Sequence, residues 1–382
     1  MKYKLSDICK YAKGKIKVSF LDDNTYISTE NMLPNKGGIT KAVSLPIQEQ
    51  TQAFMKNDVL VSNIRPYFKK IWYATFDGGC SNDVLVFRAK DGVSSSFLHY
   101  VLADDTFFDY SMASSKGTKM PRGDKKAIME YEVPEFSYED QCKIAGILEA
   151  IDEKIELNTD INKNLQAQAQ AVFLHLFADN ESVIPASIAD VALNVTDGVH
   201  NTVHDDPDGE YLLLSCKNIK GGSLSIGTSE RRINAETFEK LRRRTNLAKG
   251  DVLISSVGTV GELLLVNTEP SNYEFQRSVA MVKPNPDIVS PVYLYEALLS
   301  QKAEMINAAH GAVQQCLFIS DIAGFPIGIP TQDDLLTFDE VVTPMFDTIT
   351  ANEAETIRLA ALRDALLPKL MSGEIDVSNI DL

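Results

Sequence analysis

The residues best suited to metal chemistry are two histidines, His200 and His204, which lie four residues apart in the stretch TDGVHNTVHDDPDGE. Histidines at this spacing bind zinc when they share one face of a helix. Gly198, Pro207 and Gly209 surround them and indicate a loop rich in turns, and the sequence holds no HExxH motif. We therefore predict neither a metal ion nor a cofactor.

Motifs of catalysis are also missing from the rest of the sequence. It has no GxxxxGK[ST] phosphate loop, no GxGxxG after a predicted strand, no GxSxG, and no Asp/Asn-Pro-Pro-aromatic tetrapeptide of the kind that amino-methyltransferases use. The stretch PDGEYLLLSCK at 207–217 is weakly similar to a metal-dependent nuclease motif, but the Glu/Asp-x-Lys that would hold the metal is absent. The sequence therefore predicts a non-catalytic protein, and an enzyme of unknown type is the least supported alternative.

The net charge of −16 is distributed unevenly along the 382 residues. Residues 1–136 carry a net charge of +3 and residues 183–330 a net charge of −5, whereas residues 137–182 and 331–382 carry −6 and −8. The total charge argues against nucleic acid as a partner, because binding to phosphates needs local positive charge. Since most of the negative charge lies in two segments that look helical, the other two segments remain able to present basic surfaces.

Composition and cysteine usage predict a reduced protein in the cytoplasm. Hydrophobic residues make up 44% of the chain and charged residues 24%, as in ordinary globular proteins. The five cysteines are scattered without a CxxC spacing, which argues against a disulfide framework or a zinc site. The N-terminus shows no apolar leader and no run of about 18 apolar residues occurs, so we expect no contact with a membrane.

The chain is an imperfect tandem repeat. The stretch DVLVSNIRPYFKKIWYA at 58–74 matches DVLISSVGTVGELLLVN at 251–267 in pattern, residues 115–134 correspond to 309–330, and residues 150–166 correspond to 344–360. Each copy begins with short apolar, β-branched runs, which are typical of strands. Short helices are expected after them, at 97–113 in the first copy and at 291–309 in the second. Each copy is therefore predicted to be a mixed α+β domain.

Each copy ends in a long helical segment whose seam residues repeat at the spacing of a coiled coil and are apolar except for asparagines, which cost stability but can fix register. In the first segment, at 138–177, these residues are Ile144, Leu148, Ile151, Ile155, Asn158, Asn162, Leu165, Ala169, Val172 and Leu176. In the second they are Val342, Met345, Ile349, Asn352, Leu359, Leu366 and Leu370, and we expect this helix to stop at Pro368 and Gly373. An apolar stripe this long needs a partner, and the nearest candidate is the other copy.

The predicted fold is α+β, with two similar mixed domains joined by two long antiparallel coiled-coil helices in a pseudo-twofold internal repeat. The expected boundaries are 1–136 for the first domain, 137–182 for a central spacer helix, 183–330 for the second domain, and 331–382 for a C-terminal spacer helix and tail. The alternative is that the two segments are ordinary surface helices of a globular core.

The chain resembles the specificity subunits of type I restriction–modification systems, the HsdS family. The resemblance is seen in DVLVSNIRPYFKK followed by SNDVLVFR, and in TDGVHNT, YLLLSCKNIKGG and KGDVLISSVGTVG. It is strongest in VPEFSYEDQCKIAGILEAIDEKIELN and in the closing LRDALLPKLMSGEI, and it covers nearly the full length. The second copy departs from the family pattern at its helix start, where Gln332-Asp333-Asp334 lacks the Gln that follows the acidic pair in the first copy.

The resemblance implies that each α+β domain is a target-recognition domain that reads one half of a bipartite site in double-stranded DNA. It also implies that the two helices set the spacing of the half-sites and dock two modification (methyltransferase) subunits, while a restriction (motor–nuclease) subunit completes the complex. The catalytic sites would then lie on those partners. The helix positions expected to take part in this docking and pairing are Ile144, Leu148, Ile151, Ile155, Leu165, Val172, Ile349, Leu359, Leu366 and Leu370.

Candidate DNA contacts follow from the chemistry of the side chains, because Arg suits guanine, Asn and Gln suit adenine, and Lys suits phosphate. In the first domain the candidates are Lys13, Lys15, Arg65, Lys116, Lys119 and Arg122. In the second they are His200, Asn201, Lys217, Asn218, Gln276, Arg277 and Gln314. The run Arg242-Arg243-Arg244 is expected to be either helix surface or a phosphate clamp. Since the two domains differ widely in sequence, we expect the half-sites to differ as well.

Two other functions remain open at this point. The chain could be the specificity chain of a type IIB-like restriction enzyme, with similar lobes and different catalytic partners. It could also be a helical scaffold that bridges proteins and does not touch DNA, and the net charge of −16 is the best argument for that reading.

Overall fold

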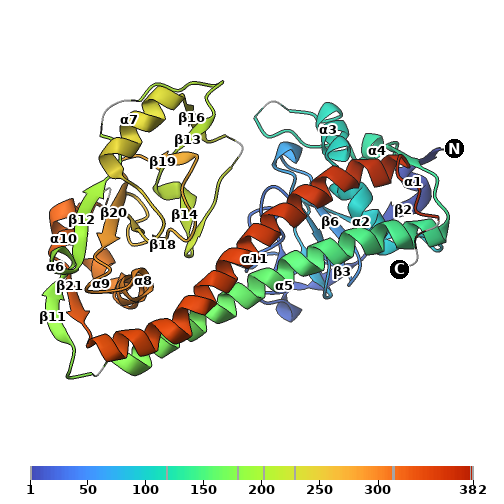
Figure 1. The fold of residues 1–382 in the computed structure, drawn as a ribbon. Coiled ribbons are helices and arrows are strands. Elements are labelled where there is room, and N and C mark those ends of the chain that lie inside the picture. Colours follow the sequence, from blue (N-terminus) through green and yellow to red (C-terminus); the bar gives the residue numbers. More distant parts are fainter. Residues whose placement is uncertain are drawn as a thin grey trace. The chain divides into compact units, whose positions relative to one another are not determined.

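The computed structural model of the chain describes residues 2–117, 119–178, 180–200, 203–227, 229–311, 315–378 and 380. These residues form two compact units (Figure 1). Unit 1 comprises the described residues of Met1–Glu156 and Thr356–Leu382, and unit 2 comprises those of Leu157–Glu355. The two longest helices, α5 (Tyr138–Phe177) and α11 (Gln332–Ser372), each contribute residues to both units.

Unit 1 is a mixed α+β domain built mainly on antiparallel strands. Its strands are β1 (Lys2–Lys4), β2 (Cys9–Tyr11), β3 (Lys15–Lys17), β4 (Tyr26–Ile27), β5 (Gln50–Phe54), β6 (Val59–Ser62), β7 (Ile71–Tyr73), β8 (Gly78–Cys80), β9 (Val84–Ala89) and β10 (Glu132–Pro134). Its shorter helices are α1 (Leu5–Ile8), η1 (Val18–Phe20), η2 (Pro66–Phe68), α2 (Ser95–Ala103), α3 (Asp105–Ala113) and α4 (Lys125–Ile128). The strands pair as β2-β9-β6-β7, β3-β5-β8-β4 and β1-β10.

Unit 2 repeats much of this order of elements and adds the helix α7. Its strands are β11 (Ile184–Ser187), β12 (Ala192–Asp197), β13 (Tyr211–Leu214), β14 (Ile219–Lys220), β15 (Ser223–Leu224), β16 (Arg231–Ile233), β17 (Val252–Ser255), β18 (Leu263–Leu265), β19 (Tyr273–Phe275), β20 (Val279–Pro284) and β21 (Pro326–Ile329). Its shorter helices are α6 (Ile188–Val191), η3 (Cys216–Asn218), α7 (Ala235–Thr245), α8 (Pro291–Ser300), α9 (Lys302–Asn307) and α10 (Ile319–Ala323). The sheet β12-β20-β17-β18 has the connectivity of β2-β9-β6-β7 in unit 1.

A buried ion pair marks the same place in both repeats. In unit 1, Asp58 is 1% exposed at the start of β6 and pairs with Arg88 on β9 at 2.6 Å. In unit 2, Asp251 is 3% exposed before β17 and pairs with Lys283 on β20 at 2.7 Å. A buried carboxylate needs such a partner, so the repeat extends to the polar groups of the interior. The predicted α+β class and internal repeat are confirmed.

The short helices predicted at 97–113 and 291–309 are present, and each of the two regions forms a pair of helices. In unit 1 the chain divides at Asp104, whose extended backbone ends α2 and whose carboxylate accepts a hydrogen bond from the Thr106 N–H at 2.8 Å to begin α3. In unit 2 the break lies at Gln301, between α8 and α9. An aspartate that caps the following helix offers the backbone an alternative to a continuous helix.

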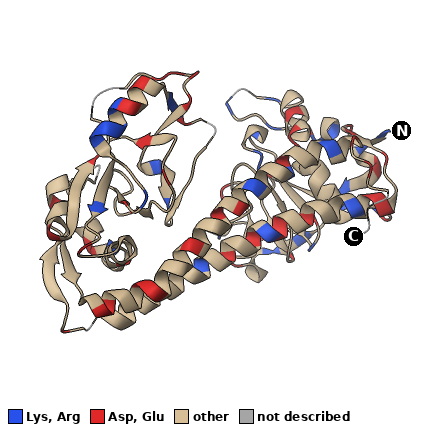
Figure 2. Ribbon diagram, in the orientation of Figure 1, with Lys and Arg blue, Asp and Glu red and all other residues tan. Residues whose placement is uncertain are grey.

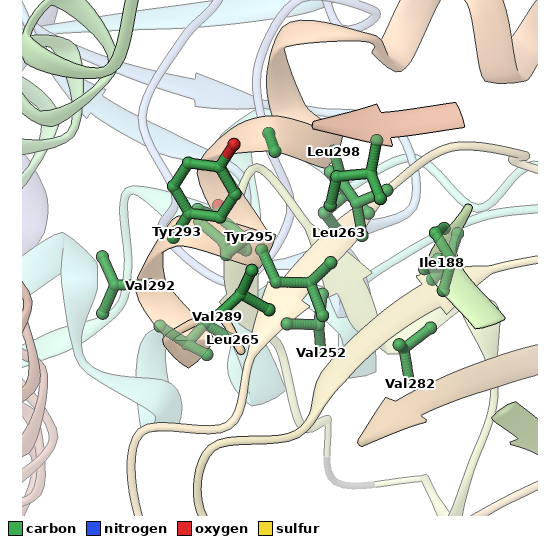
Figure 3. Close-up of a cluster of buried hydrophobic side chains, with 14 of the residues drawn as sticks. Ile188, Val252, Leu263, Leu265, Val282, Val289, Val292, Tyr293, Tyr295 and Leu298 are labelled. Carbon is green, nitrogen blue, oxygen red and sulfur yellow. The ribbon is translucent and has the colours of Figure 1, made fainter. Parts of the chain in front are cut away.

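Each long helix completes the hydrophobic core of both units. In unit 1, Ile144 and Leu148 from α5 and Leu370 from α11 belong to one buried cluster with the sheet and with α2. In unit 2, residues from the second half of α5 and the first half of α11 join the core of β17, β18, β20 and α8, part of which Figure 3 shows. In each unit the two helices therefore pair in opposite chain directions.

The buried stripe of α5 departs from coiled-coil spacing beyond Ala169. Phe173 and Phe177 follow at steps of four and are 6% and 7% exposed, whereas the predicted Val172 is only half-buried. A step of four turns the stripe around the helix, and here it directs both phenylalanines into the aromatic cluster formed with Tyr293 and Phe338.

Within unit 2, polar residues make the contact between the first residues of α5 and the last residues of α11 that belong to this unit. The Asn352 side-chain N–H₂ donates to the Asn162 amide oxygen at 2.8 Å, and the Asn158 N–H₂ donates to Glu355 at 2.8 Å. The expected stop at Pro368 was wrong, because α11 continues through it and ends at Ser372, before Gly373 with φ 75°. The predicted helix positions are buried at Ile144, Leu148, Ile151, Ile349 and Leu370 and half-buried at Ile155, Leu165, Val172, Leu359 and Leu366.

The role of the helices in the unit cores can be tested at Phe338, which is 0% exposed on α11. Phe338→Ala should lower the free energy of unfolding by about 3–5 kcal/mol, because it removes a large buried ring and leaves a cavity. The matched control is Leu336→Ala, two residues away and 59% exposed, which should change stability by less than about 0.5 kcal/mol. Urea unfolding measures both, and equal effects would show that α11 does not belong to the unit 2 core.

Glu296 on α8 makes the stability of unit 2 depend on pH. It is 0% exposed, its carboxylate oxygens have no hydrogen-bond partner among the described residues, and burial raises its pKa to about 8. Because the folded state retains a proton that the unfolded chain loses near pH 4.5, stability should fall as the pH rises from about 4.5 to 8.

Glu296→Gln should abolish this loss. We expect the variant to exceed the wild type in stability by about 2–4 kcal/mol at pH 8.5, and the difference should shrink as the pH falls towards 4.5. Melting curves across this pH range measure the effect, with the exposed Glu304→Gln on α9 as the control. A constant difference between variant and wild type at all pH values would contradict the assignment.

Candidate nucleic-acid interface

Two polar loops lie side by side in unit 1, and we call them the unit 1 loop pair. One is the loop at 63–70 between β6 and β7, and the other is the hairpin at 115–123 before α4. Two hydrogen bonds between Lys116 and Arg122, each 3.0 Å, close the hairpin. The Arg65 N–H donates to the carbonyl of Pro121 at 2.8 Å and joins the two loops.

Unit 2 holds the equivalent structure, which we call the unit 2 loop pair. It consists of the loop at 256–262 between β17 and β18 and the segment at 310–317 before α10. Two hydrogen bonds of 2.8 Å between His310 and Cys316 close this segment, and the Gly258 N–H donates to the carbonyl of Gln315 at 3.2 Å. Residues 312–314 of this segment, and with them the predicted contact Gln314, lie outside the described residues.

The two loop pairs share a backbone frame and differ in side chains. Lys116, Arg122 and Arg65 of unit 1 occupy the places of His310, Cys316 and Gly258 in unit 2. The structure thus brings together three of the predicted contacts of the first domain, and it places Lys119 in the same hairpin. A basic loop pair in one unit and a nearly uncharged one in the other would favour different partners, because the side chains decide which phosphates and base edges can be reached.

Arg65 combines an unusual backbone conformation with a guanidinium group that is not fully paired within the described residues. Its φ is 51°, whereas the equivalent Gly258 has φ 84°. A non-glycine residue pays for this left-handed conformation and keeps it only where the surroundings impose it. Its Nε atom is buried without a hydrogen-bond partner among the described residues. Such a half-buried cation is suited to bind an anionic or hydrogen-bond-accepting group from outside.

The other cations of the unit 1 loop pair make ion pairs at its edge. Arg122 contacts Asp83 at 3.0 Å and Lys116 contacts Asp124 at 2.8 Å, with more than half of each basic side chain exposed. The hydrogen bond from Lys116, together with backbone N–H groups of Lys126 and Ala127, lowers the pKa of Asp124 to about 2. Exposed ion pairs of this kind are weak, so both cations remain available to phosphate.

A second group of predicted contacts gathers at the end of β12 in unit 2. His200 is exposed, and its Nε2 lies 2.6 Å from Asp197, which also accepts a hydrogen bond from Arg244 at 3.0 Å. The backbone of Val199 pairs with that of Gln276, and the Arg277 N–H donates to the Val199 carbonyl at 3.1 Å. Gln276 is half-buried and Arg277 is exposed. Asn201, the neighbour of His200, lies outside the described residues.

The structure removes Asn218 from the candidate contacts. Asn218 is 1% exposed, its amide oxygen accepts from the Ser215 N–H at 3.0 Å, and its N–H₂ donates to the Ser225 carbonyl at 2.9 Å. Because the amide oxygen and the N–H₂ group both make hydrogen bonds that hold the turn before β14, neither group is left to contact a base edge. Lys217 beside it is exposed and pairs with Glu230 at 2.9 Å.

The remaining predictions are surface lysines and an arginine run. Lys13 precedes β3 and Lys15 begins it, and both are exposed. Arg242 is no phosphate clamp, because its guanidinium pairs with the fully buried Glu274 and lies 4.9 Å from the Phe238 ring. Arg243 is exposed on α7, whose basic last turn is visible in Figure 2. The sequence alone could not show which of these neighbouring arginines is paired within the fold and which is exposed, because they point in different directions from one helical turn.

Among the described residues, no group of three or more His, Cys, Asp or Glu side chains is placed to hold a metal ion. None of the described helices is both long and apolar enough to cross a membrane. The unit 1 loop pair offers positive groups on strand-anchored loops, and the unit 2 loop pair offers a similar backbone with few charges.

Comparisons with known proteins agree with this arrangement. Residues 1–167 match the family model described as the type I restriction modification DNA specificity domain. The chain is 28% identical over 76% of its length to the type I restriction enzyme MjaIX specificity subunit of Methanocaldococcus jannaschii, of which 71% is covered. It is 23% identical over 98% of its length to the HindI specificity subunit of Haemophilus influenzae, of which 99% is covered.

A solved structure shows the same fold. The crystal structure of the type I restriction–modification system S subunit from M. genitalium superposes with a TM-score of 0.60, at 16% identity, over 97% of this chain and 96% of that one. The overall fold of this chain is therefore similar to that of a solved subunit. The chain is thus similar, over most of its length, to specificity subunits of type I restriction enzymes, and its first 167 residues match the DNA specificity domain of that family.

Proposed function

We propose that the chain is the non-catalytic DNA-recognition subunit of a type I restriction–modification complex. Residues 1–136 and 183–330 act as two target-recognition domains, each of which binds one half of a bipartite site in double-stranded DNA. The observation that carries this proposal is that the loop pairs of the two units are equivalent. They share the same backbone hydrogen bonds and carry different side chains. Different side chains on equivalent frames support an asymmetric site with two different half-sites.

The segments 137–182 and 331–382 act as spacer helices that bind two modification subunits, and a restriction subunit joins the complex. Support for this role comes from charge, because acidic residues recur along α5 and α11 (Figure 2). An acidic surface suits a basic partner protein and repels DNA, so it would favour protein partners on the helices and DNA on the loops.

The proposal predicts DNA binding that weakens steeply with salt. The chain assembled with its modification subunits should bind duplex DNA with an affinity that falls linearly with salt on a log–log plot, with a slope of about −0.9 for each phosphate contacted. Fluorescence anisotropy at several salt concentrations measures the slope. A protein scaffold that never touches DNA, which the net charge of −16 favours, would show no binding and no slope.

Arg65 provides a test at the level of one residue. Arg65→Gly should relieve the left-handed backbone and stabilise unit 1 by up to about 1 kcal/mol, while DNA binding weakens because a cation is lost. The matched control is Asn57→Gly, since Asn57 also has a positive φ, of 71°, but lies outside the loop pair. Melting and anisotropy measure the two effects, and unchanged DNA affinity in Arg65→Gly would remove Arg65 from the interface.

A further inference from the structure

Two neighbouring aromatic side chains are uncovered at the tip of the unit 1 loop pair. Tyr67 and Phe68 on η2 are 48% and 38% exposed, and their ring centroids lie 4.7 Å apart. Single exposed hydrophobic residues are common. A contacting aromatic pair is a larger apolar surface, which water does not favour and which a flat partner surface would cover.

The turn that carries this pair is held in place on both sides. Arg65 and Lys69 flank η2, and both have left-handed backbones, with φ of 51° and 49°. The N–H groups of Asn35 and Lys36 donate to the carbonyls of Phe68 and Lys69, each at 2.8 Å. Two strained residues within five positions persist only where the surroundings enforce them, and such strain is concentrated at functional sites.

An ion-pair network fixes the same turn to α3. The ammonium groups of Lys36 and Lys69 lie 2.9 Å and 2.8 Å from the two carboxylate oxygens of Asp105, the first residue of α3. The aromatic pair is thus presented on a fixed turn. Rigid presentation lowers the entropy lost on binding.

The surroundings of the pair are basic and identify the class of its partner. Arg65 precedes it, Lys69 and Lys70 follow it, and the hairpin with Lys116, Lys119 and Arg122 is joined to it through the Arg65 N–H. Exposed aromatic rings among cations bind nucleic acid by stacking on bases while the cations contact phosphates. In duplexes, apolar side chains can also insert between base pairs and kink the helix.

Unit 2 has no such pair at the equivalent position. Its loop between β17 and β18 reads Ser-Val-Gly-Thr-Val-Gly-Glu from 256 to 262, with Gly258 and Gly261 at positive φ. The flanking frame, in contrast, is the same as in unit 1. A wedge would therefore act in one domain and not in the other.

We propose that Tyr67 and Phe68 form an aromatic wedge that inserts at a base-pair step of the half-site bound by unit 1 and unstacks it, whereas unit 2 binds its half-site without a wedge. This inference rests on the proposed function, because it assumes that unit 1 binds duplex DNA. It makes the two residues determinants of sequence preference, since the cost of unstacking depends on the step that is opened.

The test uses the full chain assembled with its modification subunits and a duplex carrying the motif that the complex modifies. The adenine analogue 2-aminopurine, which brightens on unstacking, replaces one adenine at a time in either half-site. The modified base and the base paired with it are not replaced. The double variant Tyr67→Ala/Phe68→Ala is compared with the wild type. Phe20→Ala, which removes a 75% exposed phenylalanine elsewhere in unit 1, is the matched control.

We expect the wild type and Phe20→Ala to raise the fluorescence several-fold at one step of the unit 1 half-site and at no step of the other. The double alanine variant should lose this rise and bind about 10–100-fold more weakly, in line with the loss of base stacking. The exchange Tyr67→Phe/Phe68→Tyr, which keeps both rings, should retain the signal.

A double alanine variant with unchanged affinity and an unchanged signal would overturn the wedge, as would an equal rise in both half-sites. Wild-type complex that fails to bind the duplex at all would instead contradict the proposed function. The two failures are thus distinguishable. A melting temperature of the double variant equal to that of the wild type verifies that the fold of the variant is intact.

Discussion

The structure depends on the burial of the apolar stripes of α5 and α11, because neither globular unit closes its core without them. Ile144 and Leu370 complete unit 1, and Phe173 and Phe338 complete unit 2. Each helix therefore has one half in each core. At roughly 1.5–3 kcal/mol for each large side chain fully buried, these residues fix the helices to the units more firmly than the polar contacts of Asn162 and Asn352 could.

The loop pairs of the two units share a backbone arrangement but carry different side chains, and this feature relates the architecture to recognition. The hydrogen bonds that join the two loops are the same in both units, and so are the buried carboxylate pairs below them. A frame of this kind holds loop side chains in position without dictating what they are. Unit 1 uses it to present Arg65 and an aromatic pair, and unit 2 presents glycine and histidine.

The sequence predicts the large features because they rest on long periodic patterns. The α+β class, the repeat and the start of α5 follow from apolar spacing summed over many residues. Local interactions were harder to foresee. Asp104 sets the boundary between two short helices by capping the second one, and Phe173 replaces Val172 in the buried stripe of α5. At the interface, Asn218 and Arg242 have the expected chemistry, but their neighbours in space use it within the fold, and sequence spacing does not contain that information.

The central claim is that this chain selects the DNA site of a modification complex. It is tested most directly by mapping modified bases across the genome of a host that carries the modification and restriction subunits, with and without this chain. The account predicts that one bipartite, asymmetric motif loses its modification when the chain is removed, and that supplying the chain again restores it. An identical set of modified motifs in both hosts would contradict the account.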